Sequence, residues 1–311
     1  MSTAFFTHPA CLEHRTPEGH PERIARLEHV LAALESPAFA KLDRRQAPSA
    51  PETEVLRCHP QSYLDTLRAA IPAQGLHALD ADTHVSPGSL RAALAGLGQV
   101  QGALDAVMAG EATNAFAAIR PPGHHAETAK PMGFCLFGNI AIAAKRALDH
   151  HGISRVAVVD FDVHHGNGTQ DLLWNEGRAL FVSSHQMPLW PGTGEASERG
   201  TQDNILNLPL APGCTGQDFR RAWEERVFPR LEAFAPELVL VSAGFDAHVD
   251  DPLAQLALEV EDFAWITERL CALAARHARG RLVSVLEGGY NLPALAASVT
   301  AHVTVLMEQG G

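Results

Sequence analysis

Residues 155–168 read RVAVVDFDVHHGNG and join a short apolar run to a cluster of acidic and imidazole side chains. An apolar run without alternation is typical of a strand buried on both faces, and hence of a parallel sheet. Alternate residues of a strand point to the same side, so Asp160, Asp162 and His164 are expected to project together while His165 faces away. Carboxylates and imidazoles bind divalent metals. The stretch therefore predicts a buried parallel strand with a metal site at its end.

The same kind of apolar run recurs along the chain, which extends the prediction to a whole sheet. Further strands are predicted at 114–119, 179–184, 237–245 and 281–289. Stretches with helical spacing lie between the strands, at 21–36, 87–110, 137–152, 215–234 and 259–280. This alternation predicts a three-layer α/β/α architecture with a mainly parallel central sheet, built as one domain over 1–311. Two long irregular pieces, 72–88 and 186–214, are expected to form pocket walls or rim loops.

Polar side chains follow several of the predicted strands, where the carboxyl ends of parallel strands meet. His124 and His125 follow the first run, Asp246 follows the fourth and Tyr290 follows the fifth. In open parallel sheets, ligands bind outside that edge. A lone Asp-x-His is more often a pair of polar residues that cap the next helix. Its convergence with these four side chains favours a catalytic site.

A metal site is the chemistry that the acidic residues favour. Asp246 would supply a third ligand beside Asp162 and His164, and a water molecule would complete an open catalytic site. Asp160 and Asn167 lie close enough in sequence to orient the neighbouring side chains. Two carboxylates and one imidazole accept Fe²⁺ or Co²⁺ as well as Zn²⁺, so the residues leave the identity of the metal open.

The adjacent His124 and His125 are expected to transfer protons. They follow Pro-Pro-Gly, which fixes the backbone and lets it approach closely. An imidazole with a near-neutral pKa can take a proton from an activated water and give one to a departing amine. The alternative interpretation is a pair of surface histidines in a turn, which is what we expect of His150 and His151.

Composition narrows the class of protein and its partners. Hydrophobic residues make up 46% and charged residues 19% of the 311 residues, as in compact folded enzymes. The net charge of −12 argues against nucleic acid and membrane surfaces as partners. Five cysteines without CxxC spacing argue against a disulfide framework. Without a leader sequence or an apolar run long enough to span a membrane, the sequence predicts a cytoplasmic protein. The oligomeric state stays open between a monomer and a homo-oligomer.

Several blocks of the sequence resemble, in order, the signatures of the zinc-dependent histone deacetylase superfamily. The matching blocks are GHPER (19–23), PPGHH (121–125), GFC (133–135), VDFDVHHGNGTQ (159–170), PGTG (191–194), SAGFDAHVDDPL (242–253) and EGGYN (287–291). Asn167, where class I members carry Asp, and the GFDA block are more similar to class II members and bacterial histone deacetylase-like amidohydrolases. The resemblance implies an arginase-like α/β deacetylase fold.

The resemblance also implies a role for each matching residue. Zn²⁺ would be held by Asp162, His164 and Asp246. His125 would act as general base and acid, His124 would tune the electrostatics beside it, and Tyr290 would donate a hydrogen bond to the scissile carbonyl and its oxyanion. An acyl-lysine tunnel would be lined by Gly133, Phe134, Trp190 and Leu253, with Trp190 standing where Phe is usual. A structural K⁺ would involve Asp160, Asp162, His164, Ser183 and Ser184.

Alternatives remain for the substrate and for the class of protein. The substrate would be acetyl-lysine or a small acetylated polyamine, and the lack of an obvious lid insertion favours acetyl-lysine. Acidic patches at 80–82 and 250–251 would attract a cationic substrate, although solvated surface charge is the simpler interpretation. A ureohydrolase-like binuclear metal site is disfavoured, because Gly166 stands where its second metal needs a carboxylate. A non-catalytic acyl-amine binding protein is disfavoured by the complete catalytic set.

Overall fold

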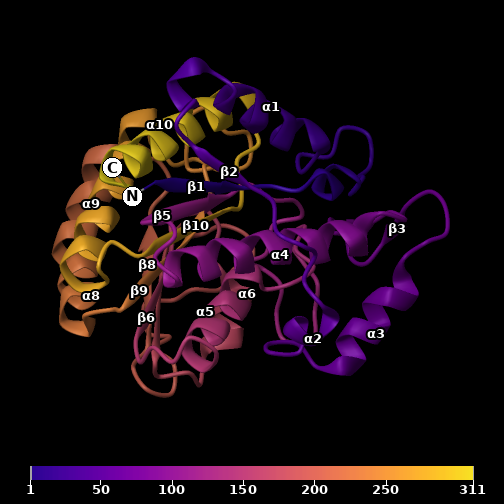
Figure 1. The fold of residues 1–311 in the computed structure, drawn as a ribbon, viewed down its shortest axis with the longest axis horizontal. Coiled ribbons are helices and arrows are strands. Elements are labelled where there is room, and N and C mark those ends of the chain that lie inside the picture. Colours follow the sequence, from indigo (N-terminus) through magenta and orange to yellow (C-terminus); the bar gives the residue numbers. More distant parts are fainter. Residues whose placement is uncertain (1, 311) are drawn as a thin grey trace.

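A parallel eight-stranded sheet forms the centre of the computed structural model, which describes residues 2–310 (Figure 1). The strands are β1 (Thr3–Phe6), β2 (Asp43–Arg45), β5 (Asn114–Ala117), β6 (Val156–Asp160), β7 (Ala179–Gln186), β8 (Ile205–Leu210), β9 (Leu238–Ala243) and β10 (Leu282–Leu286). Their order is β2-β1-β5-β10-β9-β6-β7-β8, and every pairing is parallel. A separate antiparallel hairpin is formed by β3 (His77–Ala78) and β4 (His84–Val85).

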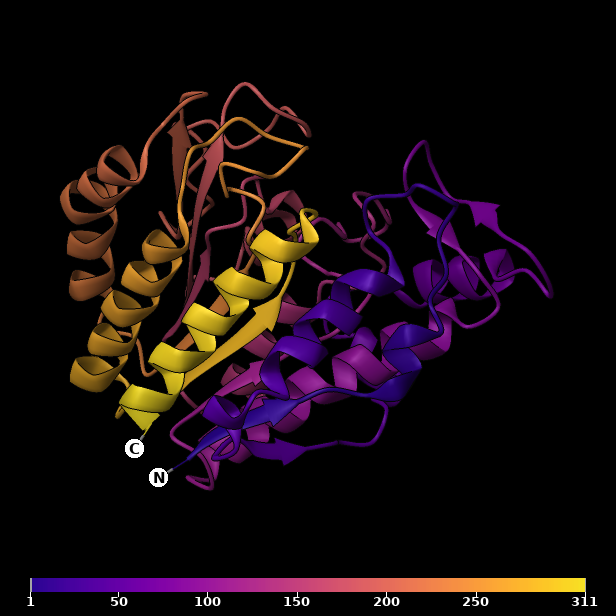
Figure 2. The same cartoon turned by 90° about the horizontal axis from the view of Figure 1, so that it is seen from above.

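Helices cover both faces of the sheet and complete the predicted three layers (Figures 1 and 2). One face carries α4 (Ser89–Met108), α5 (Asn139–Asp149) and α6 (Asn167–Leu173). The other face carries α1 (Ile24–Leu34), α8 (Phe228–Phe234), α9 (Val260–His277) and α10 (Leu292–Gly310). The remaining α-helices are α2 (Glu52–Val55), α3 (Gln61–Ala70) and α7 (Gly216–Ala222). None of the helices described is both long and apolar enough to cross a membrane.

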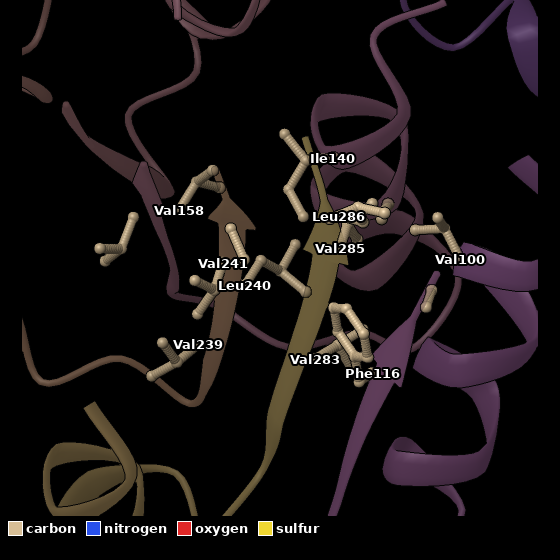
Figure 3. Packing of buried hydrophobic residues seen from close by; sticks show 14 of the residues in the cluster. Val100, Phe116, Ile140, Val158, Val239, Leu240, Val241, Val283, Val285 and Leu286 are labelled. Atoms are coloured by element: carbon tan, nitrogen blue, oxygen red, sulfur yellow. The ribbon is translucent and has the colours of Figure 1, made fainter. Parts of the chain in front are cut away.

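The core lies on both faces of the central strands. Every residue of β5, β6, β9 and β10 is buried, as an all-parallel sheet between two helical layers requires. Figure 3 shows the packing at the centre of the sheet, where Leu240 of β9 and its register neighbour Val283 of β10 are both buried. The five apolar runs singled out in the sequence are confirmed as strands, and four of them form the middle of this sheet.

The sequence prediction omitted three strands of the main sheet, the hairpin strands β3 and β4 and the helices α2, α3, α6 and α10, and it missed one helix break. The edge strands β2 and β8 were not predicted, because β2 reads DRR and is partly exposed, while β8 contains Pro209 and lies within a stretch interpreted as irregular. Strand β1 was missed because it is only four residues long. The helix predicted over 215–234 is interrupted by a π-helical turn, η3 (Trp223–Val227). Pro229 opens the following helix α8 and cannot donate a backbone hydrogen bond, which accounts for the interruption.

The sheet topology brings the polar strand ends together. Strands β5, β10, β9 and β6 are consecutive neighbours in the sheet, and their carboxyl ends lead into the segments that carry the two histidines, Tyr290, Asp246 and Asp162. The predicted convergence at one sheet edge is therefore confirmed.

Candidate active site

Asp162, His164 and Asp246 form the one buried cluster among residues 2–310 that could hold a metal ion. One ligand atom from each lies within 4.8 Å of the others. The Nδ1 atom of His164 lies 3.0 Å from Oδ2 of Asp246 and 3.2 Å from Oδ1 of Asp162. Asp162 and His164 lie in the bends after β6, and Asp246 follows the neighbouring strand β9.

Asp162 and His164 come together for a different reason than the predicted strand alternation. Strand β6 ends at Asp160, so Asp162 and His164 come together through bends in the chain and not through strand alternation. Backbone hydrogen bonds define those bends: the N–H of Asp162 donates to Oδ1 of Asp160, and the N–H of His164 donates to Oδ1 of Asp162. His165 does face away, with Nδ1 at 2.8 Å from the Thr193 hydroxyl.

The surrounding backbone leaves room for a cation and orients the ligands. The N–H of Gly288 donates to Oδ2 of Asp162 at 2.8 Å, and that of Val163 donates to Oδ1 of Asp246 at 2.9 Å. A Cβ on Gly288 would lie 2.3 Å from Oδ2 of Asp246 and 2.5 Å from Oδ2 of Asp162. Any side chain at this position would therefore fill the space between the two carboxylates.

The charges of the cluster also suit a divalent cation. Burial and the neighbouring Asp162 charge raise the pKa of Asp246 to about 7. Two buried carboxylates at this spacing are stabilised by a cation between them. Two carboxylate oxygens and one imidazole nitrogen are ligands for Zn²⁺ and also for Fe²⁺. The residues present therefore fit a single metal ion with an open position.

A second metal site of the ureohydrolase kind would lack one of its ligands. It would need a carboxylate at position 166, where the chain has Gly166. A Cβ at that position would lie 2.3 Å from Oδ2 of Asp160. The sequence argument against this site thus has a packing reason as well.

His124 and His125 lie side by side beyond the end of β5, with ring centroids 3.9 Å apart. Nδ1 of His124 lies 2.9 Å from Oδ2 of Asp160. Burial lowers the pKa of His124, but the Asp162 and Asp160 carboxylates outweigh it and raise this pKa well above its ordinary value. The neighbouring carboxylates thus favour the protonated form of His124. Both rings are buried, so the interpretation as surface histidines in a turn is wrong for this pair.

The surroundings of His125 shift its pKa in the opposite direction. Burial, followed by the charge of the neighbouring His124, lowers the pKa of His125 well below its ordinary value. Its Nδ1 lies 2.8 Å from Oδ1 of Asn167, and the Asn167 amide nitrogen donates to Oε1 of Glu127 at 2.7 Å. Because Glu127 accepts from that nitrogen, Oδ1 faces His125 and accepts a hydrogen bond from its Nδ1–H. Nε2 of His125 is therefore left free to accept a proton.

Two further carboxylates of the site were missed by the sequence reasoning. Glu127 orients Asn167, and Glu287 accepts hydrogen bonds from the backbone N–H groups of Gly123 at 2.7 Å and His124 at 3.2 Å. Burial raises the pKa of Glu287 to about 7. An acidic residue at the end of an apolar run such as LVSVLEGG is the signal that points to Glu287, whereas nothing in the local sequence distinguishes Glu127.

A cavity of about 250 Å³ leads to these groups. The four residues predicted to line a substrate tunnel lie in its wall: Gly133, Phe134, Trp190 and Leu253. Three catalytic or metal-binding candidates line it as well: His125, His164 and Tyr290. Pro21, Asp82 and Leu189 also line the cavity and were not predicted to do so. The Trp190 ring lies 4.7 Å from the His125 ring and is 41% exposed, so it covers one side of the cavity mouth.

The acidic patches are less exposed than the sequence interpretation as solvated surface charge implies. Asp82 is partly buried in the cavity wall, and Asp251 is only 6% exposed. Only Asp250 of the second patch is a largely exposed side chain. The segment 72–88, expected to form a pocket wall, does contribute Asp82 to the cavity.

The residues assigned to potassium are only partly grouped. Ser183 is the register neighbour of Asp160 on the adjacent strand β7, and its hydroxyl lies 3.0 Å from Nδ1 of His185. Successive side chains of a strand face opposite sides, so the hydroxyls of Ser183 and Ser184 cannot both face Asp160. The buried Ser184 hydroxyl has no hydrogen-bond partner within residues 2–310.

Comparison with known proteins gives the family. The histone deacetylase domain model matches residues 20–306. The chain is 40% identical to the histone deacetylase-like amidohydrolase of Pseudomonas aeruginosa, over 93% of this chain and 82% of that protein. It is 38% identical to a probable deacetylase of Archaeoglobus fulgidus, over 94% and 82% of the two chains. An uncharacterized Synechocystis protein is 44% identical over 95% of this chain and 96% of its own length.

A solved structure agrees with the sequence comparisons. The crystal structure of the HDA15 HD domain superposes with a TM-score of 0.93 and 33% identity, and the match covers 99% of this chain and 88% of that one. The predicted α/β architecture is thereby confirmed. By fold, sequence and the residues at its sheet edge, the chain belongs to the histone deacetylase family, and its chemistry is that of an amide-hydrolysing deacetylase.

Proposed function

We propose that this protein is a zinc-dependent deacetylase that removes the acetyl group from the side chain of acetyl-lysine. One observation carries the proposal: a cavity of about 250 Å³ has His125, His164 and Tyr290 in its wall, beside the three-residue cluster that suits a metal. We further propose that the whole chain acts as one catalytic domain, since the cavity is built from segments spread between Pro21 and Tyr290.

The base of the reaction is His125. When bound by Asp162, His164 and Asp246, zinc would polarise the scissile carbonyl and lower the pKa of a water molecule. The free Nε2 of His125 takes a proton from that attacking water, because Nδ1 already donates to Asn167. The proton then passes from Nε2 to the departing amine. Acetate and free lysine are the products.

Tyr290 and His124 stabilise the negative charge that develops on the carbonyl oxygen. Tyr290 lies across the cavity with its ring 5.8 Å from that of Phe134, and its hydroxyl donates to the oxyanion. Burial raises the Tyr290 pKa well above 10, so the phenol keeps its proton and stays a donor. The cationic His124, held by Asp160, adds positive potential beside the base.

The walls of the cavity support a linear amide substrate. Phe134, Leu189, Trp190 and Leu253 are apolar and suit the methylene chain of lysine. A small acetylated polyamine remains the second candidate, because Asp82 places a carboxylate in the same cavity and a carboxylate suits a second ammonium group. Structural K⁺ near Asp160 is also proposed, and the Ser183 hydroxyl, in register with Asp160 on the adjacent strand, is compatible with it.

A direct assay compares the two substrate classes. The zinc-loaded protein is given an acetyl-lysine peptide or an acetylated polyamine at equal concentration, with and without a metal chelator, and the free amine is measured. We expect chelator-sensitive cleavage of the peptide. Preference for the polyamine would replace the proposed substrate class, and no cleavage of either would contradict the proposed function.

A further inference from the structure

Asp251 is a buried carboxylate that the mechanism above does not use. It lies in the loop between β9 and α9 and is 6% exposed, whereas the side chain of its neighbour Asp250 is 68% exposed. A buried carboxylate is retained only where hydrogen bonds compensate for the loss of water. The partners of Asp251 therefore indicate what this side chain does.

The two oxygens of Asp251 hold two different parts of the active site. Oδ2 accepts hydrogen bonds from the backbone N–H groups of Tyr290 at 2.7 Å and Asn291 at 3.3 Å. Oδ1 accepts from the N–H of Leu253 at 3.0 Å, and Leu253 lines the cavity. One carboxylate thus connects the segment that carries Tyr290 to the wall of the cavity that a substrate would enter.

The segment before Tyr290 needs such an anchor. It contains Gly288 and Gly289, and Gly289 has φ +123°, a conformation that glycine adopts readily. The Arg26 guanidinium holds the carbonyl groups of Gly289 at 2.6 Å and Glu287 at 2.5 Å. The same guanidinium carbon lies 4.9 Å from the centre of the Tyr290 ring. Arg26 therefore holds carbonyl groups of this glycine-containing segment, and Asp251 holds N–H groups at its end.

We propose that Asp251 is a positioning residue that holds Tyr290 at the distance from which its hydroxyl reaches the oxyanion, and that ties this position to the cavity wall at Leu253. The proposal rests on the deacetylase function proposed above. Oxyanion donors act within about 2.7–3.1 Å of the reacting oxygen. A displacement of about 1 Å lowers the rate by about a hundredfold.

Asp251→Asn is the primary variant, because it keeps the size of the side chain but replaces one accepting oxygen with an NH₂ group. We expect kcat on an acetyl-lysine peptide to fall by about ten- to a hundredfold, with KM changed by less than about threefold and zinc content unchanged. Asp250→Asn is the matched control: it removes the same charge at the adjacent, exposed position, and its kcat is expected to stay within about twofold of the wild-type value.

A double-mutant cycle separates positioning from a general structural effect. If Asp251 acts through Tyr290, Asp251→Asn in a Tyr290→Phe background lowers kcat by less than about twofold, because the hydroxyl that it positions is already gone. An equal loss of kcat in both backgrounds would overturn the proposal. So would a wild-type kcat in Asp251→Asn. If that variant does not fold, Asp251→Glu replaces it, since it keeps the charge but moves the oxygens by one methylene.

A structural readout keeps this proposal separate from the proposed function. If the wild-type protein cleaves no acylated amine, the proposed function fails. Crystal structures of the wild type and of Asp251→Asn then decide the positioning role alone. A Tyr290 side chain displaced in the variant supports the role, and one that has not moved contradicts it.

Discussion

At the scale of single residues, burial and neighbouring charges set the two adjacent histidines apart. The Asp162 and Asp160 carboxylates raise the pKa of His124, whereas burial and the His124 charge lower the pKa of His125. Two adjacent residues of the same type thus carry different chemistry because of their surroundings. The sequence predicted the pair and the orienting role of Asp160 and Asn167. It could not predict Glu127, because that partner is brought in by a loop whose path depends on the whole fold.

Tyr290→Phe removes only the phenolic hydroxyl and tests the oxyanion role. We expect kcat on an acetyl-lysine peptide to fall by about 10²–10³, the usual effect of losing one such donor. Zinc content by elemental analysis should equal that of the wild type, since Tyr290 is not a member of the metal cluster. An unchanged kcat would remove the assigned role of this residue.

Thr83 is predicted to hold the cavity wall at Phe134. Phe134 has φ +68°, a left-handed conformation that costs a non-glycine residue about 1–2 kcal/mol. Its N–H donates to the hydroxyl of the fully buried Thr83 at 3.2 Å. Thr83→Val removes this acceptor at constant size. We expect KM for an acetyl-lysine peptide to rise about fivefold, from the loss of about 1 kcal/mol, while kcat stays within about twofold.

Two controls accompany this prediction. Thr83→Ser keeps the hydroxyl and should restore the wild-type KM. Thr3→Val makes the same chemical change at a buried position in β1, where the hydroxyl donates to the Leu306 carbonyl far along the chain, and should leave KM unchanged. Equal KM values for Thr83→Val and the wild type would contradict the role given to Thr83.

At the scale of elements, the site depends on where four strands end and how the chain turns after them. The apolar runs predicted the strands β5, β6, β9 and β10, because a strand buried on both faces needs apolar residues throughout. The bends after Asp160 were not predictable in the same way. They depend on hydrogen bonds to side chains and on glycines whose neighbours come from other strands, which a local pattern does not contain.

Gly288→Ala tests the space between the strand ends. Its Cβ would lie 2.3 Å from Oδ2 of Asp246, so the carboxylates must move apart or rotate. We expect the affinity for Zn²⁺, measured by competition with a chelating dye, to fall at least tenfold, which corresponds to about 1.4 kcal/mol. Gly96→Ala in α4, where the nearest atom would lie at 3.4 Å, is the control and should bind Zn²⁺ like the wild type. Unchanged affinity in Gly288→Ala would contradict the geometry of the cluster.

At the scale of the whole molecule, buried polar groups join segments that lie far apart in the sequence. Glu22 accepts hydrogen bonds from Arg120, 98 residues away, and from Arg26. The Arg120 and Arg26 charges overcome the effect of burial and lower the pKa of Glu22 to about 2. The fold class followed from the sequence because alternating strands and helices have few packing solutions. This ionic network could not be predicted from the sequence, since nothing in the local pattern pairs residue 22 with residue 120.

Buried neutral histidines predict how stability depends on pH. Burial lowers the pKa of His14 and His59 to about 4 and that of His302 to about 3. The unfolded chain, with histidine pKa values near 6.5, binds more protons than the folded chain below that pH. The free energy of unfolding is therefore expected to fall as pH drops from about 6.5 toward 4, by about 1–2 kcal/mol per histidine at pH 5.

Urea denaturation of the wild type and His302→Gln at pH 7.5 and pH 5 checks this expectation. The variant is less stable at both values, because it loses the hydrogen bonds of His302 to Thr267 and Ser284. The loss of stability between the two pH values should nevertheless be smaller in the variant by the contribution of one histidine. An equal pH dependence in both proteins would show that His302 is not kept neutral by burial.

The central claim is a single-metal deacetylase, and a zinc titration tests it most directly. Metal-free protein is supplied with increasing Zn²⁺, and the rate of acetate release from an acetyl-lysine peptide is measured at each step. The rate should rise linearly and reach its plateau at one Zn²⁺ per chain, because Asp162, His164 and Asp246 form one cluster within residues 2–310 and Gly166 supplies no ligand for a second ion. A rate that is independent of Zn²⁺, or a plateau at two ions per chain, would contradict this account.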